Sequence, residues 1–215
     1  PAVEDALTAA ALEHVAGVKS VQTFLPPEEA GRAEPLLRAG FRRVTRVWQM
    51  TRVAASGQVS RSSLRSRLTL VAYHDTDPAE FHRTLLRAHD DSLDCPELHG
   101  VRSPDEVLAG YWDCAPDLSA WWLARLDDEP AGVLVLGPGD LTFVGVVPER
   151  RGHGVGRALV EAAVSWRPEL SLTVDDRNVP AISLYRSLGF KPVGSRDVFV
   201  WVRSPRSGGA GVTSS

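Results

Sequence analysis

The pattern of apolar positions is most regular between residues 141 and 166. Residues 141–147 are almost continuously apolar and rich in β-branched side chains, which predicts a strand covered on both faces. After a short turn, apolar residues recur at the spacing of one helical face, and they are Val155, Ala158, Leu159, Ala162, Ala163 and Trp166. The pattern therefore predicts a strand, a glycine-rich turn and an amphipathic helix with a buried stripe.

The predicted turn contains three alternating glycines, Gly152, Gly154 and Gly156. Glycine permits a tight turn and removes the Cβ atoms that would otherwise cover the backbone N–H groups. At the positive end of a helix dipole, such N–H groups form an anion site, and Arg151 and Arg157 add full charges. We expect a diphosphate to bind there.

The spacing of the residues around the glycines excludes one kind of diphosphate site but leaves others open. No Gly-Lys-Ser/Thr follows the glycines, so the turn is not a P-loop. A dinucleotide-binding fold requires an acidic residue about 20 positions further on, and Asp175 and Asp176 lie near that distance. A nicotinamide or flavin enzyme is therefore one alternative.

Two motifs resemble those of one superfamily. The spacing Arg151-x-x-Gly154-x-Gly156 resembles the acyl-CoA pyrophosphate loop of the GCN5-related N-acetyltransferases (GNAT). Residues 178–190 follow the pattern Asn-x-x-Ala-x-x-Leu-Tyr-x-x-x-Gly-Phe, which is similar to the second signature of that superfamily. The order and separation of the two motifs also match.

This resemblance implies an α/β (α+β) GNAT fold with a mixed central sheet. It implies that acetyl-CoA or another acyl-CoA is the co-substrate and that the acyl group passes directly to a primary amine in a ternary complex. The expected acyl-CoA contacts are the backbone of Val144, Gly145 and Val146, Arg151, and the loop residues Gly152, His153, Gly154, Val155, Gly156 and Arg157. For His153 we expect the backbone N–H to matter rather than the side chain. No metal is expected.

Two residues of the second motif are expected to take part in the chemistry. Tyr185 stands where the superfamily places the tyrosine that protonates the departing thiolate, although it also shares an apolar helical stripe with Leu184 and Leu188. Asn178 is expected to bond the pantetheine amide of the acyl-CoA, or otherwise only to cap its helix.

The general base is not fixed by any motif. Residues 141–147 contain no acid, and Thr173 occupies the position five before Asn178. The candidates are Asp94, Glu97, His99, Asp140 and Asp175, with a chain of water molecules as an alternative. Asp94, Glu97 and His99 are also weak candidates for binding the acceptor, and the acidic segment 91–97 suggests a cationic one. A module that binds acyl-CoA without turnover is the alternative function.

Residues 1–53 form a partial copy of the second half of the chain. Helical patterns at 5–16 and 28–39 alternate with strand patterns at 18–25 and 44–53, and Gly40-Phe41 aligns with Gly189-Phe190. This alignment sets Leu36 on Tyr185 and Glu29 on Asn178, although any helix followed by Gly-Phe gives a similar match. The arrangement resembles the tandem members of the superfamily, such as the mycothiol synthases, with a degenerate or truncated first domain.

We expect four segments along the chain: a partial GNAT-like half-domain (1–53), a linker (54–65), a catalytic domain (66–203) and a disordered tail (204–215). From residue 67 the pattern predicts a strand, two helices, three strands, a helix, a strand, a helix and one or two final strands. Asp77-Pro78 and Ser103-Pro104 mark the starts of the first two helices.

Composition narrows the class of protein further. The 215 residues carry a net charge of -3, and 43% are hydrophobic, as in a globular protein. No basic block suggests nucleic acid, and no apolar run approaches the roughly 20 residues that span a membrane. With two cysteines and no signal peptide, we expect a cytoplasmic location. The sequence leaves monomer and homodimer open.

Overall fold

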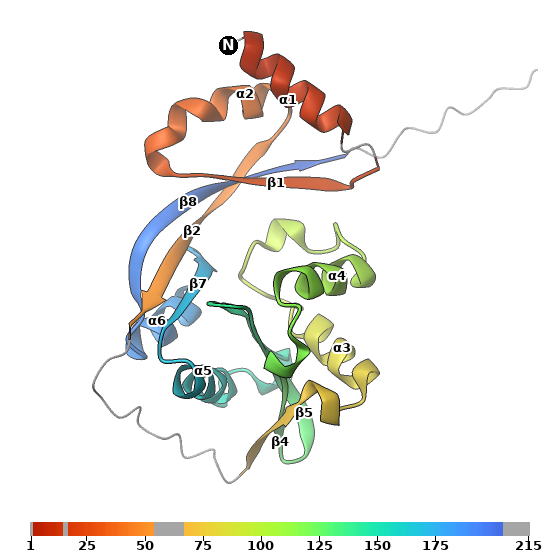
Figure 1. Cartoon of the computed structure of the whole chain (residues 1–215), viewed down its shortest axis with the longest axis vertical. Coiled ribbons are helices and arrows are strands. Elements are labelled where there is room, and N and C mark those ends of the chain that lie inside the picture. The colour runs from red at the N-terminus through yellow and green to blue at the C-terminus, as the bar shows by residue number, and fades with distance from the viewer. Residues whose placement is uncertain (1, 15–16, 54–66, 204–215) are drawn as a thin grey trace, which may run out of the picture.

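The computed structural model describes residues 2–14, 17–53 and 67–203 (Figure 1). The linker and tail expected from the sequence lie outside these residues. The described strands form two four-stranded sheets, with the orders β1-β8-β2-β7 and β3-β4-β5-β6. Between the two sheets, one isolated parallel bridge joins Asp140 to Ser171 among the described residues.

The helices and strands follow the predicted order. The helices are α1 (Ala2–His14), α2 (Ala33–Arg38), α3 (Pro78–Arg87), α4 (Pro104–Cys114), α5 (Val155–Trp166) and α6 (Val179–Ser187). The strands are β1 (Ser20–Leu25), β2 (Arg42–Arg52), β3 (Leu68–Ala72), β4 (Trp121–Leu126), β5 (Glu129–Leu136), β6 (Leu141–Val146), β7 (Leu170–Asp175) and β8 (Lys191–Val202). In the part of the chain that the structure describes, one strand, β8, follows α6.

The predicted helix starts of α3 and α4 are confirmed. The Asp77 carboxylate accepts the N–H of Ala79 at the start of α3. At the start of α4, Ser103 and Glu106 form a reciprocal capping box. Each side chain satisfies a donor that the first helical turn leaves without a partner.

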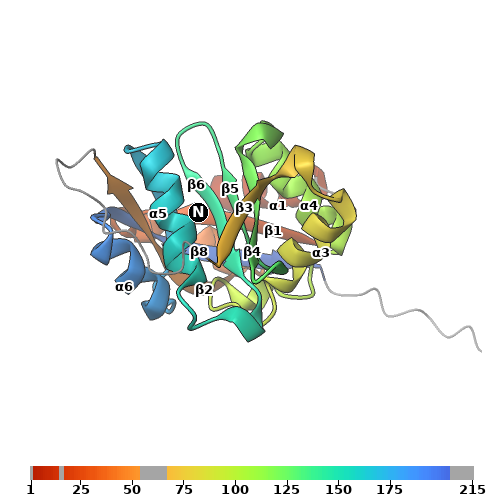
Figure 2. The same cartoon turned by 90° about the horizontal axis from the view of Figure 1, so that it is seen from below.

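The sheet β3-β4-β5-β6 is covered on both faces. Helix α5 packs against β5 and β6, whereas α3 packs against β5 from the other side, with α4 beside α3 (Figure 2). The core under α3 contains large, fully buried side chains, including Phe81, Leu85, Trp121 and Leu123. This layer fixes β6 in place between α5 and α3.

The other sheet contains a strand exchange. Strand β2 lies between β7 and β8, and it pairs antiparallel with both. In the alignment of the two repeats, Val21 corresponds to Leu170 and Arg52 corresponds to Trp201. Val21 pairs with Trp201, and Leu170 pairs in the same way with Arg52. The final strand of each repeat therefore pairs with the penultimate strand of the other, which makes this sheet nearly two-fold symmetric (Figure 1).

The two Gly-Phe corners also have the same geometry. Gly40 and Gly189 both adopt left-handed conformations, with φ of +91° and +89°. The N–H of Phe41 donates to the carbonyl of Leu36, and the N–H of Phe190 donates to the carbonyl of Tyr185, both at 3.0 Å. The alignment of these corners in the sequence thus corresponds to the same helix-ending motif at both places.

One prediction about burial is wrong. Trp166 ends α5 and is 46% exposed, because its indole packs against Trp122 at the rim rather than under the helix. Strand β6 is covered on both faces, since Val144 and Val146 pack in the core under α5 and Phe143 packs in the core under α3. Its middle residues Thr142, Phe143 and Val144 are only half-buried, because they line a cleft between β6 and β7.

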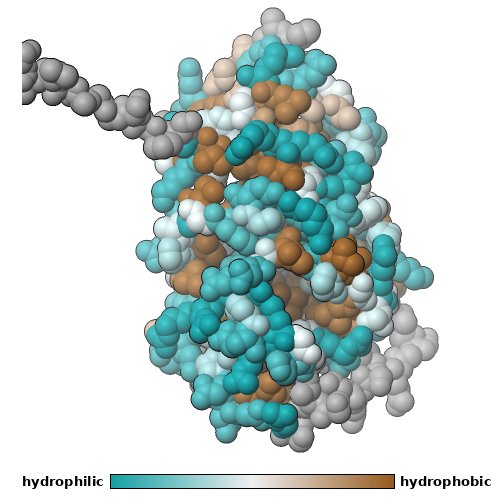
Figure 3. Space-filling view, turned by 180° about the vertical axis from the view of Figure 1, so that it is seen from behind, coloured by the Kyte–Doolittle hydropathy of each residue, from teal (hydrophilic) through white to brown (hydrophobic). Residues whose placement is uncertain are grey.

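The surface mixes apolar and polar residues. On the face seen in Figure 3, brown apolar residues gather in several patches separated by hydrophilic ones. In the part of the chain that the structure describes, no helix has the length and apolar character needed to cross a bilayer.

Met50 tests whether β2 belongs to the main core. Its side chain is 1% exposed and packs in the cluster that contains Leu159, Leu172 and Phe190. We expect Met50→Ala to lower the free energy of unfolding by about 2–5 kcal/mol, because it leaves a cavity. Denaturant melts measure the change. Leu7→Ala, at a site 66% exposed, is the control and should change stability by less than about 0.5 kcal/mol. An equally small effect at Met50 would contradict the assignment.

Candidate active site

The cleft arises because two parallel strands meet at one end and separate at the other. Strands β6 and β7 run parallel, and the bridge between Asp140 and Ser171 joins their beginnings. There, the N–H of Ser171 donates to the carbonyl of Gly139 at 3.2 Å. Further along, Val144 of β6 and Thr173 of β7 line the same cavity. The edge of β6 that faces β7 is therefore open.

Backbone groups of β6 point into this opening. The N–H of Val147 donates to the carbonyl of Ala131 in β5 at 3.0 Å, and Gly145 pairs with Val133 of the same strand. Because hydrogen-bonding residues alternate along an antiparallel pair, the N–H and C=O groups of Val144 and Val146 face the other way. Arg151 confirms this orientation, since its Nε donates to the carbonyl of Val146 at 3.1 Å. The N–H and C=O of Val144 are available to a ligand.

Gly145 allows neighbouring groups to approach β6 closely. A Cβ built at this position would lie 2.6 Å from the Phe143 ring and 2.7 Å from the Cβ of Ala88. A glycine inside a strand often marks such a close approach.

The glycine turn leaves its N–H groups uncovered. Gly152 and Gly154 have φ of +77° and +82°, and Gly154 begins α5 without a side-chain cap. The first turn of a helix leaves its N–H groups without intrahelical acceptors, and no side chain caps those of α5. The His153 Nδ1 lies 2.9 Å from the carbonyl of Arg151, so the imidazole folds back onto the turn. The turn has the geometry of an anion site.

The two arginines of the motif are engaged with the protein. Arg151 donates to the carbonyls of Ala88, Asp90 and Asp91, in addition to that of Val146. It thereby ties the segment after α3 to the end of β6. Arg157 donates to the hydroxyl of Ser187 at 2.7 Å and pairs with Glu161 at 3.5 Å. Both guanidinium groups thus keep their charge near the turn while they are held by protein partners.

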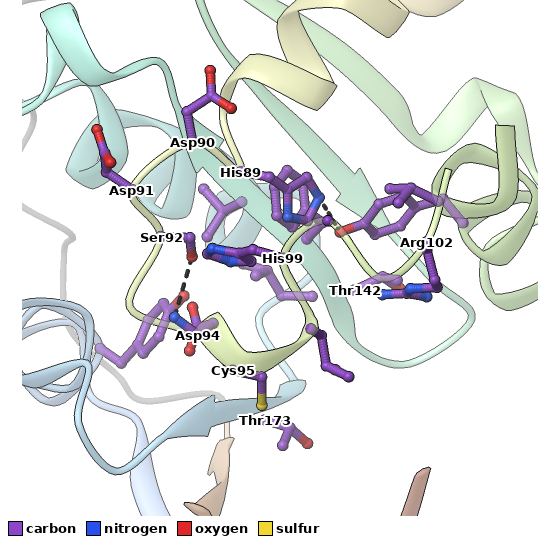
Figure 4. Close-up of a pocket in the computed structure, with 18 residues that line it drawn as sticks. His89, Asp90, Asp91, Ser92, Asp94, Cys95, His99, Arg102, Thr142 and Thr173 are labelled. Carbon is purple, nitrogen blue, oxygen red and sulfur yellow. Dashed lines mark hydrogen bonds between the residues drawn. The ribbon is translucent and has the colours of Figure 1, made fainter. Parts of the chain in front are cut away.

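Two cavities open along the cleft and share a wall. The first, of about 310 Å³, lies between β6 and α6 and is lined by Gly145, Val146, Asn178 and Ala181 among others. The second, of about 570 Å³, lies on the side of α4 and is lined by Tyr185, His99 and Tyr111 among others (Figure 4). Five residues line both cavities: Asp91, Ser92, Asp94, Phe143 and Val144.

Asp94 and Asn178 are brought together at this junction. The Asp94 carboxylate accepts the N–H of Asp175 and the Nδ2–H of Asn178, both at 2.9 Å. Burial raises the pKa of Asp94, and the negative charge of Asp175 adds to the effect, although both hydrogen bonds oppose it. The Oδ1 of Asn178 caps α6 through the N–H of Ala181. The capping role left open by the sequence is thus present.

Tyr185 is 7% exposed and lines the larger cavity. Its hydroxyl makes no hydrogen bond within the described part of the chain, so it can donate one to a ligand. Burial raises the pKa of Tyr185, and the charge of Asp94 adds to this. The phenol therefore stays protonated at neutral pH.

Asp175 holds the far side of the cleft together. Its carboxylate, 1% exposed, accepts the Thr45 hydroxyl at 2.8 Å, the Cys95 N–H at 3.0 Å and three N–H groups of Arg177. Burial alone would raise the pKa of Asp175, but these hydrogen bonds outweigh it and lower the pKa to about 2. A carboxylate so fully engaged is a poor candidate for the general base.

The other candidate bases lie in different places. Glu97 accepts two hydrogen bonds from Arg177, at 2.5 and 2.9 Å, and lines neither cavity. Asp140 lies at the closed end of the cleft, where it accepts the Thr142 hydroxyl. His99 lines the larger cavity beside Asp94. Of the acidic candidates, only Asp94 reaches the cavities.

The larger cavity also has a wall that no sequence motif indicated. His89 stacks on Phe143, with ring centroids 4.7 Å apart, and hydrogen-bonds the hydroxyl of Tyr111 (Figure 4). Burial, together with the charges of His99 and Arg102, lowers the pKa of His89 to about 4, so this imidazole is neutral at pH 7. His89, Arg102 and Tyr111 come from three separate segments, and no local spacing relates them.

In this structure two parallel strands separate beside a glycine turn, and the helix after the turn begins without a side-chain cap. This arrangement is typical of GNAT-type acyltransferase folds. The sequence model of the Acetyltransferase (GNAT) family matches residues 70–190. This chain therefore belongs to the GNAT family.

Individual relatives agree with this assignment. The peptidyl-lysine N-acetyltransferase YjaB of Escherichia coli is 36% identical over 83 residues, which are 39% of this chain and 56% of that protein. A mycothiol acetyltransferase of Kineococcus radiotolerans is 28% identical over 199 residues, which are 84% of this chain and 62% of that protein. The chain thus spans less than two thirds of these relatives. A GCN5-related N-acetyltransferase from Sphaerobacter thermophilus shares the fold, with a TM-score of 0.60 at 19% identity, over 91% of this chain and 64% of that one.

Asp175→Asn tests the structural role of the buried carboxylate. An amide has one acceptor oxygen, so a buried N–H or hydroxyl loses its partner, and we expect the free energy of unfolding to fall by about 1–3 kcal/mol. Because the pKa of Asp175 is lowered to about 2, its contribution is complete above its ordinary pKa of about 4 and is lost as the pH falls through about 2. Denaturant melts at pH 7 and near pH 2 should therefore show a difference that shrinks in acid.

Asp113→Asn is the matched control, since Asp113 is exposed on α4. A difference between wild type and Asp175→Asn that is the same at both pH values would refute the proposed role of the charge.

Proposed function

We propose that this protein is an N-acetyltransferase that transfers an acetyl group from acetyl-CoA directly to a primary amine. One observation carries the proposal: two cavities meet at Val144, with Asp94 on their shared wall and Tyr185 beside it. Two substrates that enter from the two cavities bring their reacting atoms to that junction. Such an arrangement suits a ternary complex rather than an acetylated enzyme.

The features of the smaller cavity fit an acyl-CoA. An extended pantetheine arm carries amides that pair with an open strand edge, which the N–H and C=O of Val144 offer. The turn that supplies Gly152, Gly154 and Gly156 carries uncovered N–H groups at the helix N-terminus, as a pyrophosphate requires. Arg151 acts in our proposal as a positioning residue, since its hydrogen bonds hold the walls of the groove.

Asp94 and Tyr185 suit the two proton transfers of the reaction. The amine nitrogen forms a bond to the thioester carbonyl carbon as the bond from that carbon to sulfur breaks. Asp94 accepts a proton from the amine, since its raised pKa makes the carboxylate a better base than an ordinary aspartate. The Tyr185 hydroxyl, which stays protonated, gives its proton to the departing thiolate.

The class of acceptor is not shared by the relatives. The name of YjaB specifies peptidyl lysine, whereas the name of the other relative specifies mycothiol. A small molecule and a peptide amine are both compatible with a cavity of about 570 Å³. We also propose a cytoplasmic location, where the thiols of Cys95 and Cys114, both unpaired, would stay reduced.

Tyr185→Phe separates catalysis from binding. The variant keeps the ring but loses the proton donor, so we expect kcat to fall by about 10²- to 10⁴-fold. Release of free CoA with a panel of primary amines measures turnover, and titration calorimetry with acetyl-CoA measures binding, which should persist.

Tyr73→Phe is the matched control, because the Tyr73 hydroxyl contacts His82 outside both cavities. Binding of acetyl-CoA without turnover of any amine would instead favour a binding module. Absence of binding by wild-type protein would reject the proposed co-substrate.

Asp94→Asn tests the general base through pH. The raised pKa predicts that wild-type activity falls as the pH drops through the pKa of Asp94, where the carboxylate takes up a proton. The acceptor's own titration affects both proteins equally, so the informative quantity is the ratio of the wild-type to the variant rate. We expect this ratio to be about 10²–10⁴ at neutral pH and to approach 1 in acid. A ratio that does not change with pH would exclude Asp94 as the base.

A further inference from the structure

We infer that the acceptor of the proposed reaction is a small amine that also carries a carboxylate, and that Arg102 binds this carboxylate in the larger cavity. The inference rests on the proposed function, because it specifies the acceptor of the same site. It starts from a cationic side chain that lines the cavity and has no hydrogen-bond or ion-pair partner among the described residues.

The Arg102 guanidinium is available for a ligand. Arg102 lines the larger cavity, and among the described residues it makes neither a hydrogen bond nor an ion pair. Arg151 and Arg177, the other arginines around the cleft, are engaged by backbone carbonyls and by carboxylates. An arginine presents N–H donors in a planar fork that matches a carboxylate, so a free one on a cavity wall is suited to bind an anion.

Among the described residues, no carboxylate forms an ion pair with Arg102. Figure 4 shows Arg102 beside Thr142 on one side of the cavity, whereas Asp94 lies on the other side. In the same view the carboxylates of Asp90 and Asp91 point away from the cavity. The groups nearer Arg102 are neutral, since burial and neighbouring positive charges keep the His89 imidazole unprotonated, and Tyr111 keeps its phenolic proton. The charge of Arg102 is therefore directed to the cavity.

The two ends of the cavity have opposite charge. Asp94 lies at the junction with the proposed acyl-CoA groove and attracts the amine, while Arg102 attracts an anion further from the junction. A zwitterionic acceptor is thus oriented with its nitrogen toward Val144 and Tyr185. We favour a carboxylate over a phosphate, because a dianion would be repelled more strongly by Asp94 and its acidic neighbours.

Matched acceptors test this inference. Linear ω-amino acids of increasing length are compared with their neutral primary amides at fixed acetyl-CoA, with release of CoA as the readout. For the best length, we expect the acid to exceed its amide in kcat/KM by about 10- to 100-fold, since a hydrogen bond to a charged group has that effect. The difference should lie mainly in KM, because Arg102 binds the acceptor and does not touch the reacting atoms.

Arg102→Ala should abolish the preference for the acid over the amide, and Arg102→Lys should restore part of it. Arg83→Ala, at an exposed position on α3 outside both cavities, is the matched control and should keep the preference. Equal use of acid and amide by the wild type, or a preference that survives in Arg102→Ala, would overturn the inference.

A binding measurement keeps this test separate from the test of the proposed function. Calorimetry with the CoA-saturated protein reports binding of the acid and its amide without any need for turnover. If acetyl-CoA binds but neither acceptor series binds or reacts, the inference about Arg102 fails while the proposed co-substrate stands. If acetyl-CoA itself does not bind, the proposed function fails first.

Discussion

The cleft depends on one short segment that is anchored to both of the strands that it separates. This segment comprises residues 88–95, which follow α3. Arg151 binds the carbonyls of Ala88, Asp90 and Asp91 and so fixes the segment to β6. At the other end, the Asp175 carboxylate accepts the N–H of Cys95, and Asp94 accepts the N–H of Asp175, which fixes the segment to β7. With the strands joined at Asp140 and Ser171, this segment holds the opposite end of the cleft open.

The same anchoring explains why Asp94 and Asp175, which are neighbours in space, have such different properties. Asp175 lies under the segment and accepts hydrogen bonds from Arg177, Thr45 and Cys95, so its pKa is lowered to about 2. Asp94 lies on the cleft side of the segment, where burial dominates and its pKa is raised. Cys95 adopts a left-handed backbone with φ of +44°, a conformation that its hydrogen bond to Asp175 helps to stabilise. One carboxylate stabilises the fold, and the other is the general base in our proposal.

Local features of the fold were predictable from the sequence, whereas long-range pairings were not. The caps at Asp77 and Ser103, the glycine turn and the Gly-Phe corners depend on residues within a few positions of one another, and they formed as expected. The insertion of β2 between β7 and β8 depends on partners about 120 to 160 residues away, for which no local pattern exists. For the same reason the sequence proposed Asp94 only as one of five bases, and it did not single out Arg102, since the residues around them come from separate segments.

The strand exchange links the first 53 residues to the site. Strand β2 supplies Thr45, whose hydroxyl binds the Asp175 carboxylate, and Met50, which packs in the main core. The half-domain and the catalytic domain expected from the sequence are thus packed into one sheet. Among the described strands of that sheet, β7 lies at the edge and pairs with β2 alone. Since β7 carries Asp175 at its end, and Asp175 anchors the segment that contains Asp94, the position of the proposed base is set partly by the N-terminal repeat. The N-terminal repeat therefore has a structural role in the proposed site: it supports β7, and through Asp175 it supports Asp94.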